Sequence, residues 1–162
     1  SSDLVSLTYR DSHVSGDLAR EVSMLLKSHV NKIQIIDPQK VAQWTDEHGD
    51  WSDYTEVGKA VGADMVVGID LEGFSIFEGQ TLYRGKASAT LRVYDCAKPD
   101  EAVFVKEHPT MAYPPNALVP TQDEAEIQFR RRVVKVFADE LSRHFYSHDP
   151  RSNFAIDATV LE

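Results

Sequence analysis

The chain has 162 residues, of which 42% are hydrophobic, and its formal net charge is −9 at pH 7. A chain of this length forms one domain in the usual size range, with enough apolar residues for a single core. The acidic charge argues against nucleic acid as a partner, because nucleic-acid-binding domains carry basic patches. It also argues against electrostatic docking on anionic lipid. Solubility is the simplest interpretation of the acidity.

The chain has a single cysteine and begins without a methionine. One cysteine, Cys96, permits no intrachain disulfide and does not indicate a redox compartment. No apolar run approaches the roughly 20 residues needed to span a bilayer. The chain begins Ser1-Ser2-Asp3 without an initiator methionine, so we interpret it as processed or trimmed. A signal peptide or lipid anchor further upstream would not be visible.

The first residues predict a strand followed by a helix. Apolar or aromatic residues occupy alternate positions of 4–9, which predicts a strand. Helical spacing of apolar residues over 14–30 predicts a helix with Ser15 or Asp17 as its N-cap. Asn31 suits the end of that helix.

A second strand and a second helix follow. The β-branched segment 33–36 predicts a short strand, because β-branched side chains suit extended backbone. Asp37 precedes a proline, and this pair predicts the start of a helix over 38–47. Val41 and Trp44 would form its buried face.

A third helix leads into a long apolar strand. Asp53, with a glutamate three residues later, forms a capping-box-like pattern, and we expect Gly62 to end the helix. The continuous apolar run 65–69 predicts a strand covered on both faces of a sheet. Gly68 and Gly73 mark bulges or a close approach of backbone.

Two further strands complete the predicted sheet. Apolar and polar residues alternate over 82–95, after a turn at 78–80, which predicts a strand with one buried face. Residues 102–107 predict the next strand, and we expect Pro109 to end it.

The last helix is the longest one predicted. Segment 113–120 is proline-rich and predicts an extended linker or surface loop. Helical spacing then predicts a helix over 123–145, with Thr121 or Asp123 as its cap.

The order of predicted elements, β-α-β-α-α-β-β-β-α, indicates the fold class. It implies a single α/β (α+β) layered domain with a mixed sheet, built from crossovers first and a meander afterwards. We predict this domain over 1–146 and a C-terminal tail over 147–162. Because 154–161 is apolar, we expect the tail to dock on a sheet edge, in its own chain or a neighbour's. The alternative is a disordered leash.

The sequence contains no recognisable catalytic, cofactor or metal motif. It has no GxSxG, GxGxxG or Walker loop, and no base adjoins Cys96, which is predicted to be a small packing residue. His144 and His148 are four apart, but neither has a supporting Cys or Glu ligand, and we interpret them as terminal polar residues. The acidic loop around Asp50 lacks the EF-hand template. We therefore expect no catalytic residue, no cofactor and no metal.

Two segments are candidates for partner contacts. In the proline-rich loop 111–120, Tyr113 and Leu118 are candidate anchors, since a stiff loop loses little entropy on binding. A packed connector is the alternative for this loop. In the tail, Phe154 is a candidate for the same role.

A run of three arginines, Arg130-Arg131-Arg132, lies on the last predicted helix. Glu124 and Glu126 precede it at suitable spacing, which predicts a salt-bridged solvent face. A contact of Arg130 and Arg131 with an anion or a partner is the alternative.

Three stretches together resemble a known family. They are LAREVSMLLKSH with IQIIDPQKVAQW after it, YTEVGKAVGADMVVGIDLEGF, and ASATLRVYDCAKPDEAVFVKE. The resemblance covers about residues 4–145 and rests on the element order with Gly62, Ala63, Asp64, Gly68, Tyr94 and Asp95. The chain resembles the envelope lipoprotein domain shared by the amino-terminal domain of TolB, the curli-secretion lipoprotein CsgG, the Pel-exopolysaccharide lipoprotein PelC and the penicillin-binding-protein activators.

This resemblance implies a function without catalysis. Such proteins act through protein contacts or by forming rings, which implies an envelope protein partner or a homo-oligomer on the periplasmic or outer-membrane side of a bacterium. The membrane would be reached only through an upstream lipid anchor. The membrane-inserting hairpins of the curli pore are absent, so no pore is implied. A small-molecule or polysaccharide binding module remains the alternative function.

Overall fold

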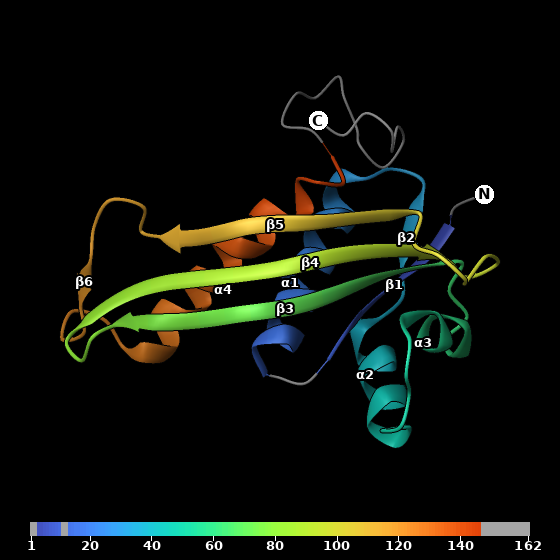
Figure 1. Cartoon of the computed structure of the whole chain (residues 1–162), viewed down its shortest axis with the longest axis horizontal. Helices are drawn as coiled ribbons and strands as arrows, with labels where there is room; N and C mark the ends of the chain where they lie inside the picture. The colour runs from blue at the N-terminus through green and yellow to red at the C-terminus, as the bar shows by residue number, and fades with distance from the viewer. Residues whose placement is uncertain (1–2, 11–12, 147–162) are drawn as a thin grey trace.

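The computed structural model describes residues 3–10 and 13–146. Its fold is the predicted α/β (α+β) one, and the predicted tail over 147–162, Phe154 included, lies outside the described residues. The elements run in the order β1 Asp3–Tyr9, α1 His13–His29, β2 Ile33–Ile35, α2 Pro38–Glu47, α3 Tyr54–Ala60, β3 Met65–Glu78, β4 Leu82–Asp95, β5 Phe104–Tyr113, β6 Val119–Pro120 and α4 Glu126–Ser142 (Figure 1).

The strands form one mixed sheet in the order β2-β1-β3-β4-β5, with β6 paired to β4. β1 is parallel to β2 and to β3, and the β3–β4 and β4–β5 pairs are antiparallel. This confirms the prediction of crossovers followed by a meander. The linker predicted over 113–120 contains a strand that the sequence did not reveal, because two residues are too short to show a periodicity.

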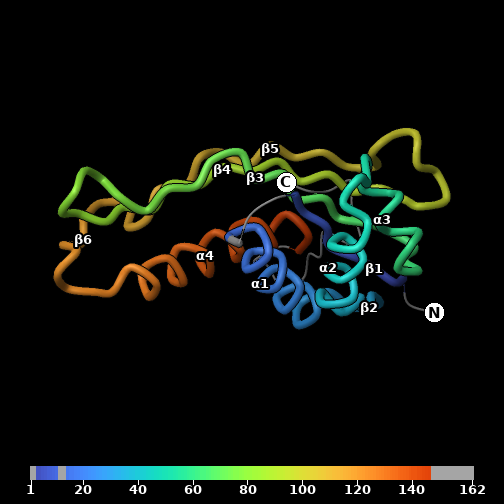
Figure 2. Tube along the Cα trace, turned by 90° about the horizontal axis from the view of Figure 1, so that it is seen from below, coloured from blue at the N-terminus to red at the C-terminus, as the bar shows by residue number. Residues whose placement is uncertain are grey.

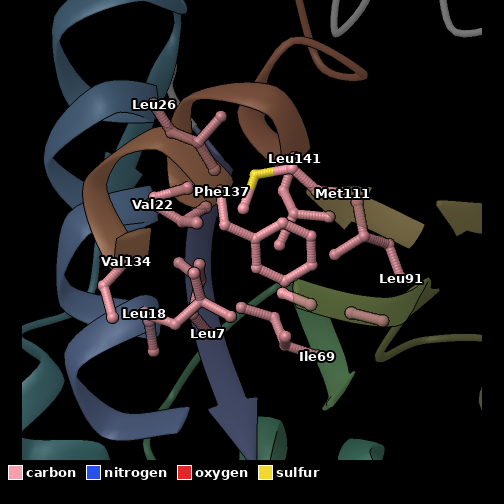
Figure 3. Packing of buried hydrophobic residues seen from close by; sticks show 14 of the residues in the cluster. Leu7, Leu18, Val22, Leu26, Ile69, Leu91, Met111, Val134, Phe137 and Leu141 are labelled. Carbon is pink, nitrogen blue, oxygen red and sulfur yellow. The ribbon is translucent and has the colours of Figure 1, made fainter. Parts of the chain in front are cut away.

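The helices lie in two places on the sheet. Figure 2 shows α1 and α4 together on one side of the ribbon formed by β3, β4 and β5. Their apolar faces meet the strands in a closely packed core, in which Leu18, Phe137 and Ile69 are fully buried (Figure 3). α2 and α3 form a smaller cluster around Val41 and Val57, next to β1 and the start of β3. One face of the ribbon is thus covered by α1 and α4. The opposite face is covered by α3 at the end where β3 starts.

The apolar start of β3 is covered on both faces, as predicted. Val66 and Ile69 have no exposed surface and Val67 is 3% exposed. Gly68 lies against the ring of Tyr54 from α3, so the predicted close approach is real. Gly73 follows a register shift between β3 and β4, which confirms the predicted irregularity.

The expectation that Pro109 ends the fifth strand is wrong. β5 continues to Tyr113, and its pairing with β4 shifts register between Ala87 and Ala89, opposite the proline. Proline has no backbone N–H, so in a central strand it removes a hydrogen bond to a neighbouring strand. β5, however, is at the edge of the described sheet. An edge position with a register shift therefore accommodates it.

Two of the predicted helix caps are confirmed and two starts are wrong. Asp37 accepts a hydrogen bond from the backbone of Gln39, and Asp53 accepts one from Glu56. α1 already begins at His13, so Ser15 and Asp17 lie within its first turns.

The start of α4 also differs from the prediction. Its N-cap is Ala125, without a side-chain hydrogen bond, so neither Thr121 nor Asp123 is the cap. The pairing of β6 with β4 holds Val119 and Pro120, and the backbone of Asp123 bonds back to Pro120. The chain therefore completes a turn before the helix can begin.

Candidate functional site

The candidate site is the outer edge of β5. In the described part of the chain β5 pairs with β4 on one side and is the last strand of the sheet on the other. Val103 immediately precedes β5 and Val105 is its second residue, and they are 56% and 51% exposed. An edge strand presents unpaired backbone groups, and soluble proteins usually protect such edges with charges or prolines. Lys106, Glu107 and Pro109 protect β5 further along, whereas the two valines at its beginning are exposed and uncharged. The beginning of the edge is therefore a surface suited to pairing.

An apolar pocket adjoins the start of this edge. It has a volume of about 190 Å³. Its walls come from β1, β2, the end of α1, and the neighbouring parts of β3, β4 and β5. They include Val5, Val30, Ile33, Met65, Val93 and Val103. Asp3 is the charged residue at its rim. The pocket can take an aliphatic or aromatic side chain, and it offers few polar groups for a polar ligand.

The chain leaves the described structure beside this pocket. Phe145, three residues after the end of α4, lines the pocket, and its ring lies 6.3 Å from that of Phe104 on β5. Tyr146 is buried and stacks on His29 at the end of α1, with ring centroids 4.4 Å apart. These contacts fix the point from which the chain continues.

Further along β5, a histidine cluster ties the strand to α4. His108 Nδ1 lies 2.8 Å from His144 Nε2, and His108 Nε2 lies 2.9 Å from Glu140 Oε1. Because an ionised carboxylate only accepts, His108 donates from Nε2 to Glu140, and a second hydrogen bond joins His108 Nδ1 to His144 Nε2. Burial, and then the nearby His108, lower the pKa of His144 to about 4. The cluster is therefore a satisfied hydrogen-bonded chain around neutral His144.

The three arginines of α4 divide between ion pairs and a cleft. Arg130 pairs with Glu126 at 2.9 Å and Arg132 with Glu124 at 2.7 Å, which confirms the predicted salt-bridged face. Arg130 and Arg131 also line a cleft of about 310 Å³ between α1 and α4. Its other walls are Asp17, Arg20, Glu21, Ile127, Val134 and Lys135. The cleft is open and mixed in charge.

The two loop candidates have different surroundings. Tyr113 is half-buried, its hydroxyl accepts a hydrogen bond from Arg132, and its ring packs towards Phe129. Leu118 is 41% exposed. Neither lies at the pocket beside Val103, so the structure does not bring together the residues proposed as contacts from the sequence.

The other face of the sheet carries a polar cluster that anchors α3. Tyr54 donates a hydrogen bond to Asp70, which also pairs with Arg92 at 3.1 Å. Burial, and then Asp70, raise the pKa of Tyr54. Arg10 lies over the ring of Trp51 at 4.2 Å. These groups satisfy one another, so we interpret the cluster as structural.

Cys96 packs in this region as predicted, 8% exposed beside Tyr54 and Val66. Burial raises the pKa of its thiol, which disfavours the nucleophilic thiolate.

Within residues 3–10 and 13–146, no group of three metal-ligating side chains is placed to hold an ion. None of the described helices is both long and apolar enough to cross a membrane.

Sequence reasoning missed the edge site and the histidine cluster. Residues 102–107 predict the strand, but the order of strands, which makes it an edge, is not readable from one sequence. Glu140 and His144 are four apart within the helix predicted over 123–145, a spacing that indicates neighbouring side chains, although α4 ends at Ser142. Nothing in the sequence connects them to His108.

Comparisons with known proteins give structural similarity only. No protein-family model matches the chain, and no curated protein matches it. Lipoprotein GNA1162 from Neisseria meningitidis is 10% identical, with a TM-score of 0.49 over 88% of this chain and 99% of its own. A minor lipoprotein from Acinetobacter baumannii is 11% identical, with a TM-score of 0.46 over 88% and 91%. The PelC dodecamer from Paraburkholderia phytofirmans is 12% identical, with a TM-score of 0.47 over 87% and 86%. Structures similar to this chain thus include bacterial lipoproteins, and similarity at this level identifies no family for it.

Proposed function

We propose that the protein is a non-catalytic adaptor or assembly domain of the bacterial cell envelope, acting on the periplasmic side through protein–protein contacts. The contact surface is the β5 edge with its exposed valines. The partner is an envelope protein or a further copy of the chain.

The observation that carries this proposal is the outer edge of β5, beside which the described residues place no further strand. Val103 and Val105 leave more than half of their surface in solvent, at the end of the sheet order. A partner strand would satisfy the edge backbone groups and bury both side chains, each worth about 1–2 kcal/mol when fully removed from water. The adjoining pocket adds a place for one anchor side chain.

The chemistry of the described residues supports a function without catalysis. The histidine cluster is internally hydrogen-bonded beside the ring of Phe137, and none of the pockets described above is lined by it. Cys96 is buried, and its raised pKa opposes use as a nucleophile. The resemblance of the sequence to envelope lipoprotein domains supports the location and a lipid anchor upstream of the chain.

Photo-crosslinking in the bacterium that carries the gene tests the proposal. A photoreactive phenylalanine analogue replaces Val105 in one strain and Met24 in another. Met24 is a matched control, because it is 56% exposed but lies on α1. We expect a defined protein adduct from position 105, recovered with the envelope fraction, and none from position 24. Equal adducts from both positions, or a chain recovered in the cytoplasm, would contradict the proposal.

A small-molecule or polysaccharide binding module is the second candidate function. The cleft between α1 and α4 favours it, because Arg130, Arg131 and Lys135 would attract an anionic ligand. Titration with alginate, an anionic polysaccharide, tests this candidate by calorimetry. This candidate function requires saturable binding of alginate. Arg131→Gln should weaken the binding, and Arg143→Gln, which lies outside the cleft lining, should leave it unchanged.

A further inference from the structure

The β5 edge needs an occupant in the free protein, and the chain itself carries one. We propose that residues 154–161 add to β5 as a further strand in the same chain, covering the apolar pocket, and that a partner strand displaces them. The docking of this segment is argued from the described structure and from the sequence of the segment, whereas its displacement rests on the function proposed above.

The first argument is position. Phe145 lines the pocket that Val103 also lines, so the chain leaves the described structure at the mouth of the proposed site. Seven residues, 147–153, separate this point from the segment, and seven residues can span up to about 23 Å. That reach covers the edge from Val103 to His108, where a strand rises about 3.3 Å per residue. The segment is therefore held close to the edge at a high effective concentration.

The second argument is the pattern of the segment. Its even positions are Phe154, Ile156, Ala158 and Val160, and all are apolar. Its odd positions are Ala155, Asp157, Thr159 and Leu161, and the two central ones are polar. Such alternation is typical of a strand with one buried face. The even side chains would face the pocket, and the odd ones would lie beside Val105 on the open face of the sheet.

The third argument is the exposed surface that would be covered. An open edge with two exposed valines and an apolar pocket is a liability for association in a soluble protein. A tethered strand removes this liability and still allows exchange, since its pairing is local and can open without unfolding the core. A partner with a longer or more apolar strand would then compete for the same edge.

Hydrogen exchange measured by mass spectrometry on the full chain tests the docking. Three proteins are compared: the wild type, Val103→Asp, and Ile127→Asp as the matched control. Ile127 is 54% exposed, close to the 56% of Val103, but lies on α4 outside the pocket. We expect the amides of 154–161 to exchange at least about tenfold more slowly in the wild type and Ile127→Asp than in Val103→Asp. Fast exchange in all three proteins, or equal protection in all three, would overturn the inference.

A disulfide trap separates docking in the same chain from docking on a second copy. Val105→Cys is combined in turn with Ala155→Cys, Asp157→Cys and Thr159→Cys, which sample neighbouring registers. The control pairs Ile127→Cys with Asp157→Cys. We expect mild oxidation to give a crosslinked monomer in at least one edge pair and in no control. Crosslinked dimers, with no crosslinked monomer, would show a neighbouring copy as the occupant and overturn the proposal.

Displacement of the segment by a partner is tested by repeating the photo-crosslinking at position 105 in a chain that carries Phe154→Asp and Ile156→Asp. We expect the yield of the partner adduct to rise severalfold when the segment cannot dock. An unchanged yield would overturn displacement. If partner adducts form at position 105 but the amides of 154–161 exchange fast, the docking is refuted and the proposed function stands. If those amides are protected but no partner adduct forms, the proposed function is refuted and the docking stands.

Discussion

At the scale of single residues, the position of α3 depends on a contact between a glycine and a tyrosine. Gly68 on β3 lies under the ring of Tyr54, whose hydroxyl bonds to Asp70 two residues further along the strand. A Cβ at position 68 would overlap the tyrosine ring, so the helix can approach the sheet only because the side chain is missing.

Gly68→Ala should destabilise the protein by about 2 kcal/mol, the usual size of an overpacking penalty in a rigid core. Gly49→Ala is the control, because a Cβ there meets nothing within 4 Å. Thermal melts of both variants test the contact, with a Tyr54→Ala background in which the cost of Gly68→Ala should disappear. Equal melting temperatures for the two alanine variants would contradict it.

His144 predicts a pH dependence of stability. Its pKa is about 4 in the folded protein, against 6.5 in the unfolded chain. The unfolded state therefore binds more protons between these values, and stability is lost as the pH falls from 6.5 to 4. Because His144 is only partly buried, we expect a loss on the order of 2 kcal/mol, which His144→Gln should reduce.

Urea unfolding at pH 7, 5.5 and 4.5 measures this dependence. His48→Gln is the control, since His48 is exposed just after α2, where its ring stacks on Trp44 and Nδ1 hydrogen-bonds to the Trp44 carbonyl oxygen. An identical pH profile for His144→Gln and the wild type would show that the cluster does not couple protons to folding.

At the scale of elements, β3 and β5 show opposite environments for the same residue type. Val67 is 3% exposed between two layers, whereas Val105 is 51% exposed on the edge. Val67→Asp should abolish folding, because an unpaired charge would be buried. Val105→Asp should change the free energy of unfolding by less than about 0.5 kcal/mol, as is usual at the surface.

Circular dichroism and expression of soluble protein test this pair. A soluble Val67→Asp variant with the melting behaviour of the wild type would refute the assignment of the central strand. A Val105→Asp variant that unfolds would show that the edge belongs to the core.

Local patterns predicted most elements, and the misses have common causes. The caps at Asp37 and Asp53 and the apolar run 65–69 were readable, because each depends on neighbours in sequence. The path of β5 through Pro109 was not, since it depends on which strands pair. The start of α4 was displaced by β6, whose pairing with β4 joins segments far apart in the chain.

The candidate site was less predictable than the fold for the same reason. Exposure of Val103 and Val105, the pocket beside them and the His108–His144 contact all arise where distant segments meet. The Arg130–Glu126 pair was predictable, because the two residues are four apart on one helix.

At the scale of the whole molecule, the account requires no bound metal. The described residues contain no cluster of metal-ligating side chains. Dialysis against EDTA should therefore change the melting temperature by less than about 1 °C, whereas a structural ion contributes to folding directly. A drop of several degrees, or stoichiometric zinc by elemental analysis, would contradict this prediction.

The central claim is that the protein works through contacts at the β5 edge. The most direct test is the mass of the particle extracted under native conditions from the envelope, for the wild type and for a chain carrying Val103→Asp and Val105→Asp. Charges on an edge strand oppose pairing, so we predict a complex larger than the chain for the wild type and the free chain for the variant. Particles of the same mass in both samples would contradict the claim.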